Sequence, residues 1–93
     1  MRTYLVERFL PSVPDDELAR IGERARDACR RLAAAGVEVR YLGSTLVPED
    51  ESCFCLFEAS SRADVERANQ ESGLSYVRLS QAVATDERLT RAT

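Results

Sequence analysis

No histidine occurs anywhere in the chain. Histidine is the commonest general base near neutral pH and the commonest ligand for transition metals, so its absence excludes Ser-His-Asp triads, Cys-His pairs and histidine-based zinc sites. The three cysteines are an odd number in a chain without an export signal, which favours reduced thiols over a disulfide framework. Acid–base chemistry would therefore have to come from other groups, such as carboxylates.

An excess of positive charge is also missing. Thirteen lysine and arginine residues stand against sixteen acids, a net charge of -3, so no basic field attracts nucleic acid or an anionic membrane. No apolar run approaches the ~20 residues of a membrane span, and the N-terminal segment turns polar again at Glu7. We expect a cytoplasmic protein with no nucleic-acid or membrane partner.

The length of 93 residues allows one small domain and excludes a two-domain enzyme. We expect the domain to cover residues 1–84, followed by a flexible tail at 85–93 that lacks apolar periodicity. Hydrophobic spacing and turn residues predict a strand over 3–9, a helix from Pro14 to a cap at Gly36, strands over 37–47 and 52–59, a helix from Ser61 to Gly73, and a strand over 76–83.

This β-α-β-β-α-β order is that of ferredoxin-like, α+β domains, with a four-stranded antiparallel sheet in the order 4-1-3-2 and both helices on one face. Alternation of side chains assigns the two faces of the sheet. One alternate set is almost wholly apolar and is expected under the helices: Tyr4, Val6, Val37, Val39, Tyr41, Cys53, Cys55, Phe57, Val77 and Leu79. Cys29 lies on the inward stripe of the long helix, and we interpret all three cysteines as core residues rather than as a thiolate site for a soft metal.

The other alternate set mixes charged groups with six large apolar ones: Leu5, Glu7, Phe9, Arg40, Leu42, Ser44, Leu46, Phe54, Leu56, Glu58, Arg78 and Ser80. A sheet face rarely exposes so many apolar side chains to water. We therefore expect a homodimer in which a second copy packs face to face, forming a dimeric α/β barrel with a cavity between the sheets.

Polar groups on this open face suggest a site. If the hairpin turn spans 47–51, then Leu46 lies opposite Ser52, Ser44 opposite Phe54, Leu42 opposite Leu56, and Arg40 opposite Glu58. Glu7 and Glu58 would then lie on the two central strands, with Arg78 and Arg40 outside them. Two neighbouring carboxylates can hold a general base near neutral pH, whereas the simpler interpretation is an ion-pair lattice at a dimer interface.

Two functions from different classes follow. The first is a small-molecule-binding protein whose cavity is lined by Leu5, Glu7, Arg40, Leu42, Ser44, Leu56, Glu58 and Arg78, because apolar walls with a few polar groups are typical of ligand sites. The second is a cofactor-independent isomerase, cyclase or oxygenase that uses Glu7 or Glu58 as its base, an expectation that rests on fold analogy.

Several segments resemble a known family. They are 4–8, 36–50, 53–59, 68–69 and 72–74, of which 43–59 is the most specific, and together they resemble the nickel-responsive-protein-like family of small domains of unknown function. The resemblance implies a ferredoxin-like fold, a homodimer and, for one branch, nickel binding. This chain differs from that branch in having no histidine, so we assign no metal ligands and expect no cofactor, with a metal sensor as the third alternative.

Overall fold

The computed structural model describes residues 1–11 and 15–83. Its elements are β1 (Arg2–Phe9), α1 (Asp15–Ala34), β2 (Val39–Val47), a short 3-10 turn (Pro48–Asp50), β3 (Ser52–Ala59), α2 (Arg62–Ser72) and β4 (Arg78–Ala82). The predicted helix start at Pro14 and the tail over 85–93 lie outside the described residues. Neither described helix is both long enough and apolar enough to cross a membrane.

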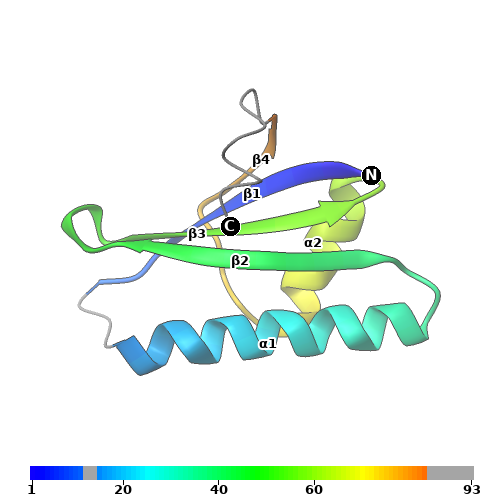
Figure 1. Cartoon of the computed structure of the whole chain (residues 1–93), viewed down its shortest axis with the longest axis horizontal. Coiled ribbons are helices and arrows are strands. Elements are labelled where there is room, and N and C mark those ends of the chain that lie inside the picture. The colour runs from blue at the N-terminus through cyan, green and yellow to red at the C-terminus, as the bar shows by residue number, and fades with distance from the viewer. Residues whose placement is uncertain (12–14, 84–93) are drawn as a thin grey trace, which may run out of the picture.

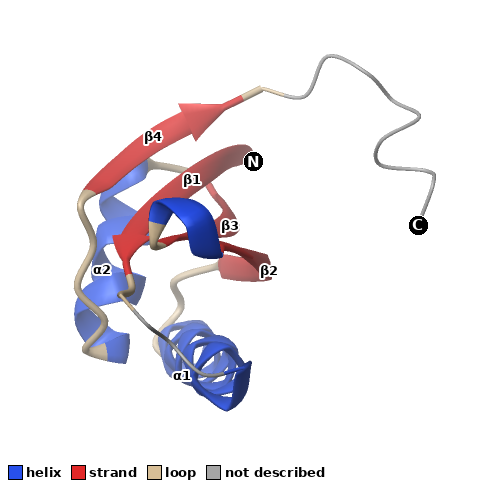
Figure 2. Ribbon diagram, turned by 90° about the vertical axis from the view of Figure 1, so that its left-hand side faces the viewer, coloured by secondary structure: helices blue, strands red, loops and turns tan. Residues whose placement is uncertain are grey.

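The four strands form one antiparallel sheet with the order β2-β3-β1-β4. Read from the other edge, the same neighbours give 4-1-3-2. Both helices lie on one side of this sheet, and α1 runs alongside β2 (Figures 1 and 2). The architecture is therefore the α+β arrangement that the order of the elements predicted.

Local signals explain where the helices begin and end. At the start of α2, the Ser61 hydroxyl accepts a hydrogen bond from the Asp64 backbone N–H, which satisfies one of the free donors of the first turn. Gly73 ends α2 in the left-handed region, with φ of 72°, where a side chain would be strained. Arg31 lies in the last turn of α1, where a cation complements the helix dipole.

The hydrophobic core lies between the helices and the covered face of the sheet. Its buried side chains come from every strand and both helices, and they include Tyr4, Val6, Ile21, Ala25, Leu32, Val39, Cys53, Cys55, Phe57, Val65 and Leu79. The prediction that Val77 lies on the covered face is wrong. This residue precedes β4 and is 64% exposed, so no helix covers it. The remaining residues assigned to the covered face of β1 and β3 are buried as expected.

A β-bulge in β2 changes the register near the hairpin. Arg40 lies opposite Glu58 as predicted, but the register shifts between Tyr41 and Gly43, and Ser44 then lies opposite Cys55. The predicted pairings of Leu46 with Ser52, Ser44 with Phe54 and Leu42 with Leu56 are therefore wrong. One extra residue in a strand moves every later side chain to the other face.

Ser44 and Leu46 accordingly belong to the covered face instead of the open face. The Ser44 hydroxyl contacts the buried Cys55 sulfur, and Leu46 packs against the core. Gly43, with φ of 149°, provides the backbone conformation at the bulge, one that residues with a side chain rarely adopt.

Candidate functional site

The open face of the sheet is apolar at its centre. Leu5 on β1 pairs with Leu56 on β3 and with Ser80 on β4, and Phe54 lies opposite Glu7. Leu56 is 37% exposed, Leu42 50% and Phe9 60%. No described element covers this side of the sheet (Figure 2). The predicted residues Leu5, Leu42 and Leu56 thus lie on one surface.

The charged residues of the open face form two separate pairs. Arg40 Nη1 lies 3.9 Å from Glu58 Oε1, and Arg78 Nε lies 4.0 Å from Glu7 Oε1. Along β1, Glu58 is opposite Thr3 whereas Glu7 is opposite Phe54. This offset of four residues separates the two glutamates by about 13 Å at ~3.3 Å per residue. Within one chain they do not form the paired acid–base site that the sequence suggested.

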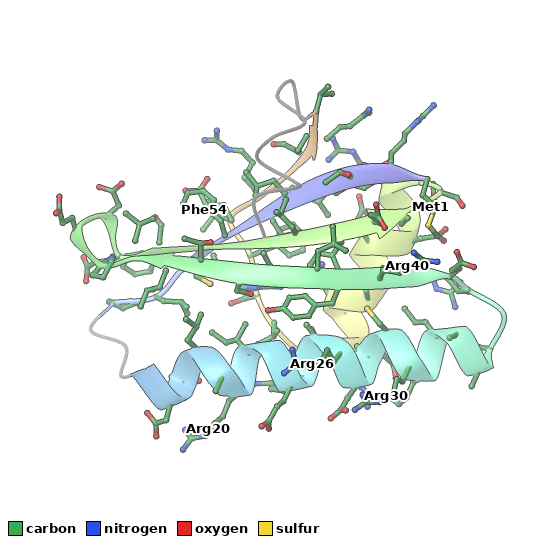
Figure 3. All side chains as sticks on the ribbon, viewed as in Figure 1. Met1, Arg20, Arg26, Arg30, Arg40 and Phe54 are labelled. Carbon is green, nitrogen blue, oxygen red and sulfur yellow. The ribbon has the colours of Figure 1, made fainter. Side chains whose placement is uncertain are left out.

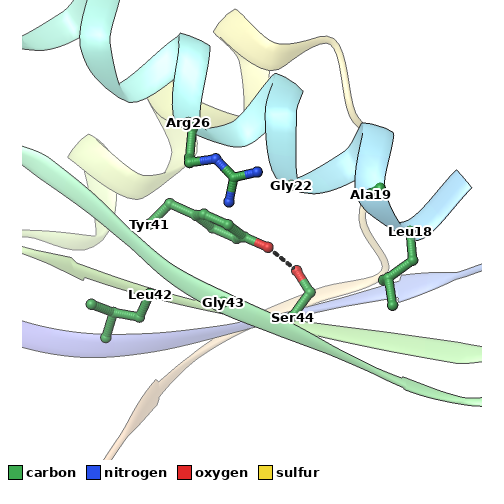
Figure 4. Close-up of a pocket in the computed structure, with 8 residues that line it drawn as sticks. All are labelled: Leu18, Ala19, Gly22, Arg26, Tyr41, Leu42, Gly43 and Ser44. Atoms are coloured by element: carbon green, nitrogen blue, oxygen red, sulfur yellow. Dashed lines mark hydrogen bonds between the residues drawn. The ribbon is translucent and has the colours of Figure 1, made fainter. Parts of the chain in front are cut away.

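A pocket lies between α1 and β2, on the covered side of the sheet. Its volume is about 420 Å³, and it is lined by Leu18, Ala19, Gly22, Arg26, Tyr41, Leu42, Gly43 and Ser44 (Figure 4). Figure 4 shows Leu42 on the far side of β2 from α1, whereas Tyr41 and Ser44 point toward the helix. This volume is within the usual range for small-molecule sites.

Arg26 and Tyr41 form the polar wall of this pocket. The Arg26 guanidinium carbon lies 5.6 Å from the centre of the Tyr41 ring, a cation–π distance. The Tyr41 hydroxyl hydrogen-bonds to Ser44. Figure 3 shows Arg26 on the side of α1 that faces the sheet, with Arg20 and Arg30 on its outer side. A Cβ on Gly22 would approach the Tyr41 hydroxyl at 3.3 Å, so this glycine leaves room for Tyr41.

Behind Ser44 lies a buried polar network around Arg8, which is only 2% exposed. Its Nη2 donates to Asn69 Oδ1 at 2.6 Å, its Nη1 to the Ser75 carbonyl at 3.1 Å, and its Nε to Cys55 Sγ at 3.4 Å. Cys55 Sγ also lies 3.0 Å from Ser44 Oγ. The network therefore runs from the wall of the pocket into the core.

Cys55 and its neighbour on the same strand face, Cys53, have opposite shifts in their pKa. A hydrogen bond from Cys53 lowers the pKa of Cys55 to about 6, with further lowering from Ser44 and Arg8 that outweighs the effect of burial. The same hydrogen bond, together with burial, raises the pKa of Cys53. Burial also raises the pKa of Cys29 and of Tyr41. A single thiolate at Cys55 is the charge state that this arrangement favours near neutral pH.

Sequence reasoning did not identify Arg8, Arg26 and Tyr41 as members of a site. Arg8 shares the alternation of Tyr4 and Val6, which places it on the covered face, and this position was its only signal. An arginine is usually expected at the surface. Arg26 lies among the charged residues of the long helix, which gave no reason to separate it from a solvated surface, and Tyr41 was expected in the apolar set under the helices.

Comparison with known proteins identifies the family to which this chain belongs. The crystal structure of SCO4226 from Streptomyces coelicolor A3(2) has the same fold, with a TM-score of 0.73 and 13% sequence identity over 90% of this chain and 99% of that chain. No curated protein sequence gives a significant match. A sequence model of the family described as nickel responsive protein SCO4226-like matches residues 4–81. The chain therefore belongs to the SCO4226-like family, as the resemblance of its segments indicated.

Proposed function

We propose that this protein binds a small molecule as a homodimer. The observation that carries the proposal is the open sheet face, on which Leu5, Phe54 and Leu56 remain partly exposed between two Arg–Glu pairs. An apolar patch with a charged rim is typical of an interface between proteins. A second copy would remove this apolar area from water.

Two sheets packed in this way would enclose the predicted cavity. Its walls would be Leu5, Glu7, Arg40, Leu42, Leu56, Glu58 and Arg78 from each copy. Ser44 leaves this set, because the bulge turns it toward Cys55. The cavity would combine apolar walls with a few fixed charges, which is the usual character of a ligand site.

The pocket between α1 and β2 is a second place for a ligand. It offers one cation, Arg26, and the hydroxyl groups of Tyr41 and Ser44, beside the apolar Leu18. These groups suit a small anionic molecule with an apolar body. Because a single chain forms this pocket, binding there would survive loss of the dimer.

The experiment is native mass spectrometry of the untagged protein with the variant Leu56→Glu. We expect a dimer for the wild type, with any retained ligand visible as added mass, and a monomer for Leu56→Glu, because the new carboxylate would be buried opposite its own copy. Val77→Glu is the matched control, since Val77 is 64% exposed and lies outside the open face. A wild-type monomer would contradict the proposal.

Nickel binding is a second candidate because of the family description. The donor groups of one chain do not fit a nickel site. There is no histidine, and within residues 1–11 and 15–83 no three cysteine or acidic side chains come together to hold an ion. Nitrogen and thiolate donors are those that nickel favours over carboxylates. The same mass spectra, recorded with added nickel, would test this candidate.

A further inference from the structure

Arg26 differs from the other arginines of α1 in its partners. In the described part of the chain, no ion pair or side-chain hydrogen bond joins its guanidinium to an acceptor. The other arginines of this helix each donate to a carboxylate or a carbonyl oxygen: Arg20, Arg24, Arg30 and Arg31. Arginine stays protonated and carries five N–H donors. The donors of Arg26 are therefore available to an anion that enters the pocket between α1 and β2, which Arg26 lines.

The Tyr41 ring holds this guanidinium in place. The guanidinium carbon of Arg26 lies 5.6 Å from the centre of the ring, and the ring itself packs at 5.6 Å against Phe57, which is fully buried. Burial raises the pKa of Tyr41, so its hydroxyl stays neutral and does not compete for the charge of Arg26. A donor that is ordered before binding loses less conformational entropy when a ligand arrives.

Gly22 keeps the space beside these groups empty. A Cβ on Gly22 would lie 3.3 Å from the Tyr41 hydroxyl oxygen, and 3.5 and 3.6 Å from the two terminal nitrogen atoms of Arg26. A glycine inside a helix costs about 1 kcal/mol relative to alanine, and Gly22 lies inside α1. The chain thus gives up helix stability at the point where a methyl group would crowd the donors of Arg26.

The charge and size of the pocket select the class of ligand. Among the described residues that line it, only Arg26 is charged. A monoanion balances this charge, whereas a dianion such as a phosphate monoester would keep one negative charge without a partner. The planar fork of a guanidinium matches a carboxylate. The volume of about 420 Å³ is near the lower end of the range for ligand sites, so the molecule must be small.

We propose that the pocket between α1 and β2 binds a small monocarboxylate with a compact apolar body, of the size of benzoate. The carboxylate binds the Arg26 guanidinium, and the apolar body lies against Leu18 and Ala19. Gly22 determines specificity by leaving room for the carboxylate. This inference rests on the second ligand place described under the proposed function, and it does not require the dimer.

The test is a titration of the ¹⁵N-labelled wild-type protein with benzoate, followed by NMR. We expect saturable shifts of the backbone amides of Gly22, Gly43 and Ser44, which line the pocket. Benzamide has the same shape without the charge, and acetate has the charge without the ring. Each should bind at least about tenfold more weakly than benzoate, because each lacks one of the two interactions. No saturable shift of these amides with millimolar benzoate, or equal binding of benzamide, would overturn the proposal.

Variants locate the carboxylate. Arg26→Gln should weaken benzoate binding at least about tenfold, because it removes a charge-assisted interaction. Arg20→Gln is the matched control. It removes the same charge from the outer side of α1, where the Arg20 side chain is 63% exposed (Figure 3), and it should bind as the wild type does.

Gly22→Ala tests the empty space without removing a polar group. It should remain folded, because alanine favours a helix, with folding checked by circular dichroism. It should nevertheless bind benzoate at least about tenfold more weakly, because the methyl group would lie against the Arg26 nitrogen atoms. Wild-type affinity in Arg26→Gln or in Gly22→Ala would contradict the proposal.

The variant Leu56→Glu separates this inference from the proposed dimer. Because a single chain forms the pocket, Leu56→Glu should bind benzoate with wild-type affinity. A monomeric wild type that needs Arg26 for binding would contradict the dimer and support this inference. Shifts confined to the amides of Leu5 and Leu56 would place benzoate on the open face, and would overturn this inference while leaving the proposed dimer standing.

Discussion

The two faces of the sheet both carry arginine, in surroundings that differ in every respect. On the open face, the side chains of Arg40 and Arg78 are 64% and 72% exposed and approach glutamates at 3.9 and 4.0 Å. On the covered face, Arg8 is 2% exposed and its three interactions are with an amide, a backbone carbonyl and a sulfur. On the open face, water can solvate both members of each Arg–Glu pair if the pair separates. On the covered face, water does not reach Arg8 and Cys55, so neither group can be solvated without the other.

This difference separates two roles for charge in a small domain. Exposed pairs contribute little to stability, because water and salt screen them. A buried pair costs free energy to desolvate, and removing one partner is strongly destabilising because the other charge is left alone. Arg8 and Cys55 should therefore respond to substitution far more than Arg40, Arg78 and their glutamates.

The largest effect is expected for Cys55→Ala. It leaves the Arg8 guanidinium buried without a counter-charge, and we expect the free energy of unfolding to fall by about 3–5 kcal/mol. Cys53→Ala removes an equally buried sulfur and its hydrogen bond to Cys55 but leaves no charge unpaired, so it should cost less, about 2 kcal/mol for the cavity and the hydrogen bond together. Urea denaturation of both variants measures the difference. Equal losses of stability in the two variants would mean that Cys55 and Arg8 do not form an ion pair.

A double variant sharpens this result. In Arg8→Met with Cys55→Ala, both partners are gone, and uncharged buried groups take their place. We expect the pair of substitutions to cost less than the sum of the two single ones, because the lone charge no longer exists. Additive losses in this cycle would contradict an ion pair.

The stability should also depend on pH, with a defined sign. The pKa of Cys55 is lowered from 9.0 to about 6 on folding, so between these values the folded protein binds fewer protons than the unfolded chain. The contribution of Cys55 to the free energy of unfolding is fully present above pH ~9, decreases as the pH falls, and is lost below pH ~6. Three other groups have raised pKa values, namely Cys29, Cys53 and Tyr41. They affect the pH dependence of stability only above this pH range.

Urea denaturation at several pH values between about 6 and 9 tests this dependence. The wild type should become more stable as the pH rises, and Cys55→Ala should lose that slope while keeping the contributions of all other groups. An identical slope in the two proteins would assign the pH dependence to another residue.

The sequence predicted the elements and the two faces of the sheet well, because both depend on local periodicity. Ser52–Ala59 has its predicted bounds, and the caps at Ser61 and Gly73 were identified from residue type alone. The alternation of β1 and β3 placed Leu5, Leu56 and Glu58 correctly. These features require no knowledge of distant contacts.

The candidate site was predicted less well, since it depends on long-range geometry. A single extra residue at the bulge beside Gly43 moved Ser44 and Leu46 to the other face. A glycine inside a strand often marks such a bulge, and this was the available signal. The partners of Arg8 depend on the register between β1 and β3 and on the placement of Asn69 on α2. No local sequence pattern contains this information.

The smallest effect is expected on the open face. Arg78→Gln removes the partner of Glu7, and in the background of Leu56→Glu, where we expect this face to be in water, the free energy of unfolding should change by no more than about 0.5 kcal/mol. The change should shrink further as salt is raised, because salt screens exposed charges. Chemical denaturation of the two proteins at low and high salt provides the measurement. A loss as large as that of Cys55→Ala would show that exposure does not separate the two classes of arginine, and that the distinction between the faces is wrong.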